Sequence, residues 1–209
     1  MAKTKRGIFI TFEGTEGSGK STLISHLRQG LEKAGKKVVS TREPGGNPVS
    51  EKIRETVLNF PMNAWTELLL YEAARSENLA QFVLPALSEG KIVLCDRFTD
   101  SSLAYQGYAR GLPWKKVTLL NELATQGLIP DLTVFLDIDP EVGLRRAQDG
   151  NRFEEEGVKF QEKVRRGFLR ARRENPKRWL TLKIHHQTPE QLTKTVLKEV
   201  VRRFRVVTP

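Results

Sequence analysis

The sequence GTEGSGKS, residues 14–21, decides the fold. It matches the pattern GxxxxGK[ST], in which glycines let consecutive backbone N–H groups curl around a phosphate group. Lys20 brings a positive charge to the β- and γ-phosphates of a nucleoside triphosphate, and Ser21 supplies a hydroxyl for Mg²⁺. Apolar residues 8–12 before the motif indicate a buried strand, and the spacing after Lys20 indicates a helix. This is the context that a phosphate-binding loop (P-loop) requires.

The rest of the chain alternates between strand and helix patterns, which predicts a parallel sheet with helices on both faces. The expected strands cover residues 8–12, 38–41, 92–95, 132–137 and 180–184. The expected helices cover residues 20–34, 64–87, 113–127 and 140–148, and a last one begins at Pro189 with Thr188 as its cap. Polar residues 149–157 lack any period, and we expect a mobile loop there.

Length and composition favour a single domain over residues 1–209. Hydrophobic residues make up 38% of the chain, and 209 residues leave little room for a second core. The one cysteine, Cys95, cannot form an internal disulfide, and no Cys/His spacing suggests a zinc site. We find neither a secretory signal nor a stretch of membrane-spanning length, and we expect a cytoplasmic protein without a membrane partner.

The net charge of +10 comes from the last third of the chain. Residues 1–141 hold 17 basic and 17 acidic side chains, whereas residues 142–209 hold 18 and 8. Such an excess suits a nucleic acid, an anionic small substrate or solvated helix faces. We assign most of it to solvated faces and expect no specific nucleic-acid partner, because no recognised binding module is present.

The remaining motifs limit the class of reaction. P-loops occur in GTPases, in ATP-driven motors and in small-molecule kinases. The chain has no NKxD-type guanine-binding motif, and its compact size favours phosphoryl transfer to a small acceptor. Arg42 and Arg97 follow the second and third expected strands, at the edge where open parallel sheets bind ligands. We expect both guanidinium groups to converge there on one phosphate group of the acceptor.

The order of these motifs resembles the thymidylate kinase family of nucleoside monophosphate kinases along nearly the full chain. The matching segments are the P-loop with Glu16, TREPGG at 41–46, LYEAAR at 70–75, DRF at 96–98, AYQG at 104–107 and the run from PDLT to PEVGL at 130–144. The resemblance implies an α/β fold, a P-loop three-layer α/β/α sandwich. Its five-stranded parallel sheet has the order 2-3-1-4-5, with a small lid at about 145–158. It also implies Mg²⁺-dependent transfer of a phosphoryl group from ATP to dTMP by a homodimer.

The resemblance further implies a role for each matching residue. Arg97 and Arg42 bind the dTMP phosphate, Tyr71 stacks on the base, and Asp96 helps Ser21 to hold Mg²⁺. Tyr105 crowds the place of a ribose 2′-hydroxyl, and Arg75 recognises thymine together with Gln106 or Ser102. The implied contacts to ATP are Gly14, Thr15, Glu16, Gly17, Ser18, Gly19, Lys20, Ser21, Thr22 and Arg145.

The chain departs from part of the family within the P-loop. Some members carry an arginine where this chain has Gly17, so another cation must stabilise the transferring phosphoryl group. The candidates are Arg145, Arg146 and Arg152 around the expected lid, and Arg152 is the preferred one. The implied catalytic residues are therefore Lys20, Glu16, Arg97, Arg152 and Arg146.

Two alternative functions and the role of one apolar helix face stay open from the residues alone. Another nucleotide kinase would differ in its preferred acceptor, and a nucleic-acid-stimulated P-loop ATPase would hydrolyse ATP faster with DNA. The apolar face of residues 64–87 suits either a dimer interface or the core. A second departure from the family, Ile184-His185-His186-Gln187 near the C-terminus, leaves the adenine contacts undefined.

Overall fold

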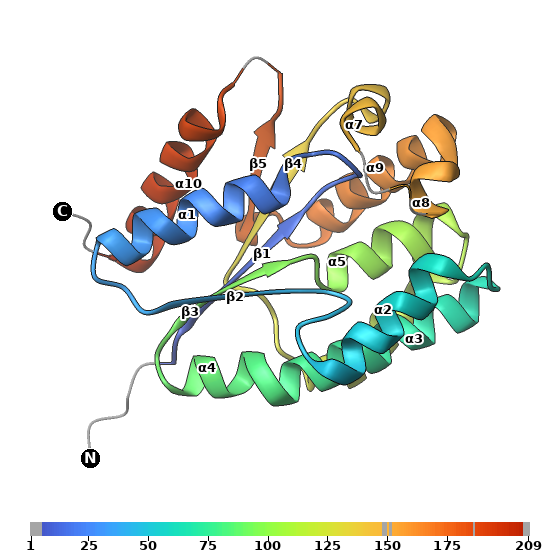
Figure 1. The fold of residues 1–209 in the computed structure, drawn as a ribbon, viewed down its shortest axis with the longest axis horizontal. Helices are drawn as coiled ribbons and strands as arrows, with labels where there is room; N and C mark the ends of the chain where they lie inside the picture. The colour runs from blue at the N-terminus through green and yellow to red at the C-terminus, as the bar shows by residue number, and fades with distance from the viewer. Residues whose placement is uncertain (1–5, 148–149, 151, 186, 207–209) are drawn as a thin grey trace.

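The computed structural model describes residues 6–147, 150, 152–185 and 187–206, and its centre is a parallel sheet. The five strands are β1 (Ile8–Glu13), β2 (Val38–Arg42), β3 (Ile92–Asp96), β4 (Leu132–Asp137) and β5 (Trp179–Lys183). They are arranged in the order β2-β3-β1-β4-β5, as the family resemblance implies, and every pairing is parallel (Figure 1).

The register of the sheet brings its chemically important segments to one edge. Asp96, at the end of β3, is paired with Phe12 on one side and with Arg42 on the other. The P-loop begins at Gly14, directly after β1. Because all strands run in one direction, their carboxyl ends place the P-loop and the segments after β2 and β3 next to one another.

One face of the sheet is covered by α1 (Lys20–Lys33) and α10 (Pro189–Phe204), which lie together on one side of the strands in Figure 1. Strand side chains alternate between the two faces, so Ile10 and Phe12 pack with Leu27 of α1 and Val196 of α10. This cluster contains no residue of the other helices that cover the sheet except Val142, which is partly buried.

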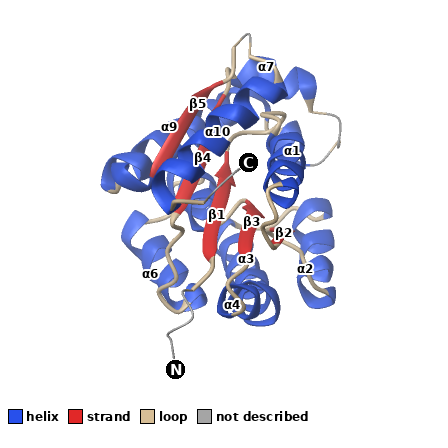
Figure 2. Ribbon diagram, turned by 90° about the vertical axis from the view of Figure 1, so that its left-hand side faces the viewer, coloured by secondary structure: helices blue, strands red, loops and turns tan. Residues whose placement is uncertain are grey.

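The other face is covered by several helices, as Figure 2 shows from a second direction. Phe9 packs against the continuous segment α3 (Ala64–Asn78), η1 (Leu79–Val83) and α4 (Leu84–Ser88), which confirms the long helix that the sequence predicts. Phe135 packs against Phe168. The further helices are α2 (Pro48–Asn59), α5 (Thr99–Ser102), η2 (Leu103–Ala109), α6 (Trp114–Thr125), α7 (Pro140–Arg146), α8 (Arg152–Glu155), α9 (Gly157–Glu174) and η3 (Pro176–Arg178).

Two long helices, α2 and α9, have no counterpart among the expected elements, and neither do the shorter α5, η2, α8 and η3. Helix α2 begins at Pro48 after the cap Asn47 and buries only Ser50 and Val57, so its apolar period is weak. In α9 the buried positions do recur at helical spacing, but many basic residues separate them. Helices are stabilised mainly by tertiary packing, which such sequences do not reveal.

The expected mobile loop at 149–157 is wrong for its central part, where Arg152–Glu155 form α8. Phe153 is buried and packs against Tyr105 and Tyr71, and this packing gives the segment an apolar anchor that its charged neighbours conceal in the sequence. Residues 148, 149 and 151 lie outside the described part of the chain. The expected helix at 140–148 ends at Arg146, because Ala147 is extended.

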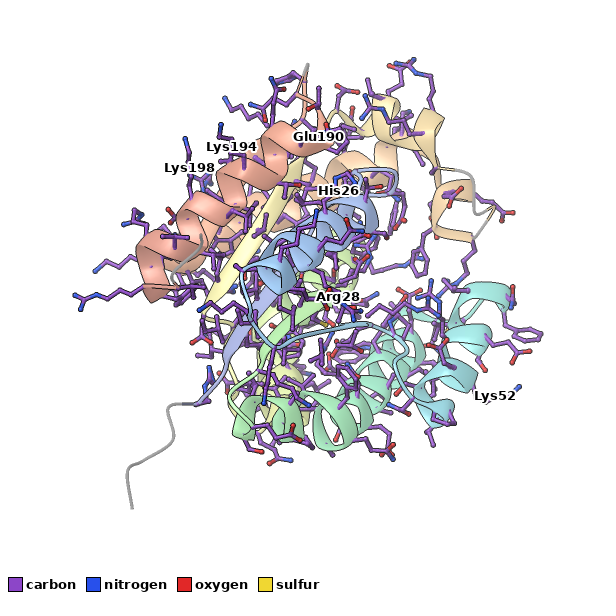
Figure 3. The ribbon with its side chains drawn as sticks, turned by 60° about the vertical axis from the view of Figure 1, so that its left-hand side comes forward. His26, Arg28, Lys52, Glu190, Lys194 and Lys198 are labelled. Atoms are coloured by element: carbon purple, nitrogen blue, oxygen red, sulfur yellow. The ribbon has the colours of Figure 1, made fainter. Side chains whose placement is uncertain are left out.

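The basic side chains of the last third are partly solvated and partly structural. Figure 3 shows Lys194 and Lys198 on α10 pointing away from the ribbon. In contrast, Arg178 donates from both terminal nitrogens to Asp100, at 2.7 Å and 2.6 Å, and that carboxylate is fully buried. Within the described residues, no helix is long and apolar enough to cross a membrane.

Candidate active site

The P-loop approaches α7 so closely that a side chain would not fit between them. Gly17 has a φ of 64°, and a Cβ atom there would lie 1.9 Å from the carbonyl oxygen of Gly143. A Cβ atom on Gly143 would lie 2.5 Å from the carbonyl oxygen of Glu16. Glycine is therefore required on both sides of the contact.

Lys20 lies inside the curve of the P-loop. Its ammonium group donates to the carbonyl oxygens of Gly14 and Thr15 and to the Ser18 hydroxyl, at 3.3–3.4 Å. Burial, and then the charge of Arg97, lower the pKa of this ammonium group. Gly19 is the N-cap of α1 and has no side chain that could occupy the free N–H groups of the first turn. These groups and Lys20 together suit a bound polyphosphate.

Ser21 and Asp96 place two side chains with oxygen atoms that could bind a metal ion beside the P-loop. The Ser21 hydroxyl donates to Oδ2 of Asp96 at 3.2 Å. Oδ1 of Asp96 is buried and has no hydrogen-bond partner among the described residues. The described residues contain no group of three His, Cys, Asp or Glu side chains that could hold a metal alone. The pair fits Mg²⁺, which typically binds one or two protein oxygens and completes its shell with water and phosphate.

A cavity lies beside the P-loop, between η2, α3 and the loop after β2. We call it the inner cavity. It is lined by Glu16, Glu43, Pro44, Arg54, Leu58, Tyr71, Arg75, Arg97, Ser101, Ser102, Tyr105, Gln106 and Phe153. A second hollow, the P-loop cleft, is lined by residues 16–22, Asp96, Arg146 and others. The two share Glu16, Glu43, Arg54, Leu58 and Arg97, so they meet at these residues.

Arg97 lies at this junction in a left-handed backbone conformation, with a φ of 68°. Its guanidinium group donates to Oε1 of Glu16 at 2.7 Å and to the carbonyl oxygen of Gly14 at 2.8 Å. The Tyr105 hydroxyl donates to the same Glu16 oxygen at 2.8 Å, and Arg97 lies over the Tyr105 ring. Burial works against the charge of Arg97, but Glu16, Tyr105, Asp96 and Glu13 together outweigh it and raise the pKa of the guanidinium group.

The charge of Glu16 is stabilised by the same contacts. Burial alone would raise the pKa of its carboxyl group, but the positive charges of Arg97 and Lys20 and the Tyr105 hydrogen bond outweigh burial and lower it. Glu16 is therefore an ionised hydrogen-bond acceptor at the point where the two hollows meet.

Arg75 is fixed in the wall of the inner cavity by a buried hydrogen-bond network. It donates to Glu43 at 2.8 Å, to Glu72 at 2.6 Å and to the Ser102 hydroxyl at 3.0 Å. Its side chain is only 2% exposed. The Glu72 and Glu43 charges outweigh the effect of burial and raise the pKa of the guanidinium group. A residue held in this way presents a fixed surface to a ligand.

The structure brings most of the predicted site residues together. Glu16, Tyr71, Arg75, Arg97, Ser102, Tyr105 and Gln106 line the inner cavity. Gly17, Ser18, Gly19, Lys20, Ser21, Thr22, Asp96 and Arg146 line the P-loop cleft, and Gly14 and Thr15 begin the loop.

Three predicted arginines do not line the inner cavity, although Arg42 is among the residues that line the P-loop cleft. Arg42 does not line the inner cavity, because it forms an exposed ion pair with Glu51 at 3.0 Å at the rim of the P-loop cleft. Arg145 pairs with Glu141 one helical turn away and is 65% exposed. Arg152 turns toward α3, where it donates to Glu67.

The sequence analysis missed Arg54 and Phe153, which line the inner cavity. Arg54 is on α2 and donates to the carbonyl oxygen of Pro44 at 3.1 Å. The cap sequence Asn47-Pro48 marks the start of α2 and is the one local signal that would have revealed this helix.

Glu13, the last residue of β1, is a buried carboxyl group behind this site. One oxygen accepts a hydrogen bond from the Phe98 N–H at 2.9 Å, and the other lies 2.6 Å from the Ser101 hydroxyl. Burial and the negative charge of Asp100 raise its pKa from 4.5 to about 8, while Ser101 and Arg97 oppose the shift. Glu13 thus fixes the backbone directly after Arg97.

Comparisons with known proteins agree on one family. The family model described as Thymidylate kinase matches residues 12–196. The curated thymidylate kinase of Clostridium novyi (strain NT) is 49% identical over 181 residues, covering 83% of this chain and 88% of that protein. The thymidylate kinase of Bacillus velezensis is 48% identical over 184 residues, with coverages of 84% and 87%. The crystal structure of thymidylate kinase from Ehrlichia chaffeensis superposes with a TM-score of 0.78 at 33% identity, over 93% of this chain and 98% of that one.

We expect Glu13 to make the stability of the protein fall as pH rises. The pKa of Glu13 is about 8 in the folded chain and 4.5 as an unperturbed side chain, which represents the unfolded state. Between these two pH values the folded state keeps a proton that the unfolded state has lost, so the free energy of unfolding falls as pH rises. In thermal melts between about pH 5 and pH 9, the Tm of the wild type should therefore fall with rising pH more steeply than the Tm of Glu13→Gln. The exposed Glu55→Gln is the control. Parallel curves for wild type and Glu13→Gln would contradict this assignment.

Proposed function

The chain belongs to the thymidylate kinase family, and on that premise we propose how its residues carry out the reaction. The enzyme phosphorylates dTMP to dTDP, a step of nucleotide biosynthesis, with ATP as the phosphoryl donor. We propose that it works as a single domain in the cytoplasm, where its one cysteine stays reduced.

The observation that carries this proposal is the meeting of the inner cavity and the P-loop cleft at Glu16, Arg54 and Arg97. A nucleotide monophosphate in the inner cavity would place its phosphate between Arg97 and Arg54. ATP in the P-loop cleft would place its γ-phosphate at the same junction. Holding both groups in line is the main catalytic contribution in phosphoryl transfer. Arg54 therefore takes the place that the sequence analysis assigned to Arg42.

The donor side uses positive charge and backbone N–H groups. We propose that Lys20 and the first turn of α1 bind the phosphates of ATP, while Arg146 approaches from the end of α7. Ser21 and Asp96 would hold Mg²⁺. When bound, this ion supplies charge neutralisation on the β- and γ-phosphates. Glu16 keeps Arg97 in place and faces the reacting groups.

The acceptor side uses the remaining walls of the inner cavity. We propose that Tyr71 stacks on thymine and that Arg75, Gln106 and Ser102 lie along its polar edge. The Tyr105 ring, packed edge-on against Phe153 at 5.7 Å, would leave no space for a 2′-hydroxyl. Phe153 comes from the lid, so the lid completes the wall of the acceptor site.

An acceptor panel tests the proposed reaction. ADP formation from ATP and Mg²⁺ should be fastest with dTMP, slower with dUMP, dCMP, dGMP and UMP, and unaffected by added DNA. Removing Mg²⁺ with a chelator should abolish it. Arg54→Ala should raise KM for dTMP by about 10-fold or more and KM for ATP much less, because it removes a charged partner of the acceptor phosphate while Lys20 and the first turn of α1 still bind ATP. Acceptor-independent turnover that rises with DNA would overturn the proposal.

The two lid arginines should have separable effects. Arg146 lines the P-loop cleft, so we expect Arg146→Ala to lower kcat by about 100-fold or more. Arg152 instead contacts Glu67 and the carbonyl oxygen of Val57, so Arg152→Ala should act mainly on KM for dTMP. Arg166→Ala, on the exposed side of α9, is the control. A large loss of kcat in Arg152→Ala with little loss in Arg146→Ala would reverse this assignment.

We also propose that the enzyme is a homodimer formed by α3 and α6. These helices expose Trp65, Leu69, Leu119 and Leu123, which are 39%, 52%, 55% and 66% accessible. Large apolar residues gathered on neighbouring helices are typical of a protein interface.

Sedimentation velocity tests this interface. The wild type should sediment as a dimer, and Leu123→Glu should sediment as a monomer, because a buried charge would be unpaired there. Phe60→Glu is a matched control, since Phe60 is 61% exposed but follows α2. A monomeric wild type would exclude the proposed dimer.

A further inference from the structure

Glu67 is a buried carboxylate of α3 that the reaction described above does not use. Its side chain is completely inaccessible to solvent. Oε1 accepts hydrogen bonds from Nε2 of Gln106 at 2.8 Å and from Nε of Arg110 at 3.3 Å. Oε2 accepts from Arg152 at 2.5 Å and from Nη2 of Arg110 at 3.3 Å. Glu67 thus joins two arginines, one of them from the lid, to a residue of the inner cavity.

The contact with Glu67 decides which way the Gln106 amide points. A carboxylate can only accept hydrogen bonds, so the NH₂ group of Gln106 must face Glu67. The carbonyl oxygen of Gln106 is then the group left for the cavity that Gln106 lines. That oxygen makes no hydrogen bond to any of the described residues, so it is available to a ligand.

An outward carbonyl oxygen distinguishes between pyrimidines. Thymine and uracil carry a hydrogen on N3 and can donate it to this oxygen. Cytosine has a lone pair on N3 and would face the oxygen with a second acceptor, which leaves both groups buried without a partner. A site built around one such polar group discriminates strongly against a ligand with the wrong pattern.

We propose that Glu67 is a positioning residue for base selection, fixing the Gln106 amide so that the site accepts a base with N3–H and rejects one without it. This inference rests on the proposed function, because it assumes that the inner cavity binds the acceptor base. The same carboxylate accepts a hydrogen bond from Arg152, so α8 is attached to the residue that orients the amide.

The substitution Glu67→Gln tests the inference by reversing the amide. Arg152 and Nη2 of Arg110 would still donate to the one oxygen that a glutamine retains, which turns the new NH₂ group toward Gln106, and only Nε of Arg110 would lose its acceptor. Gln106 must then present its oxygen to this NH₂ group and its own NH₂ group to the cavity.

The measurement is kcat/KM for dTMP, dUMP and dCMP in each variant. In Glu67→Gln the preference for dTMP over dCMP should fall by about 10- to 100-fold, the effect of one mismatched hydrogen bond. The preference for dTMP over dUMP should not change, because these bases share the same N3–H. Both ratios are taken within one preparation, so a loss of folded enzyme cancels.

Two further variants complete the test. The double variant Glu67→Gln/Gln106→Glu should restore the preference for dTMP over dCMP, because a carboxylate at 106 again offers an oxygen to the cavity. Glu77→Gln, which changes a carboxylate of α3 that contacts Gln81, should leave every ratio unchanged. An equal loss for all three acceptors in Glu67→Gln, or an unchanged dTMP to dCMP ratio, would overturn the inference. A wild type without preference for dTMP would instead contradict the proposed function.

Discussion

The ion pair between Arg97 and Glu16 is the interaction on which the site depends. It joins the loop after β3 to the P-loop at 2.7 Å, with both side chains mostly buried. Arg97 also binds the Gly14 carbonyl oxygen and lies over the Tyr105 ring, whose hydroxyl donates to Glu16. A buried charge is tolerated only where such partners are complete, and removing one partner leaves the other charge uncompensated. The pair therefore fixes the junction at which the inner cavity and the P-loop cleft meet.

Buried carboxylates support this pair from several directions. Glu13 fixes the backbone after Arg97, and Glu43 and Glu72 hold Arg75. Glu67 links Gln106 of the inner cavity to Arg152 of α8. Each of these carboxylates accepts hydrogen bonds that water would otherwise accept, and so holds its donor groups in one orientation. A phosphoryl-transfer site needs such preorganised groups when charge develops on the γ-phosphate.

The P-loop and the alternation of strands and helices could be predicted from local patterns, whereas the sheet order and most residues of the inner cavity were expected only from the resemblance to the thymidylate kinase family. The P-loop spacing is fixed by covalent geometry, and the strands are short apolar runs. Arg54 and Phe153 could not be predicted in the same way. Arg54 is on a helix with few buried residues, and Phe153 is a single apolar residue among charged ones whose burial depends on Tyr105 and Tyr71 from distant segments. The position of Arg152 likewise depends on a partner 85 residues away.

The close contact between Gly17 and Gly143 has a consequence for how such an enzyme can evolve. An arginine at position 17 would need space for a Cβ atom 1.9 Å from the Gly143 carbonyl oxygen, and no rotamer removes that clash because it involves backbone atoms. Placing an arginine at this position of the P-loop therefore requires α7 to shift in the same step. The residue at position 17 and the position of α7 are therefore coupled, and a side chain introduced at position 17 alone would lose the fit between loop and helix.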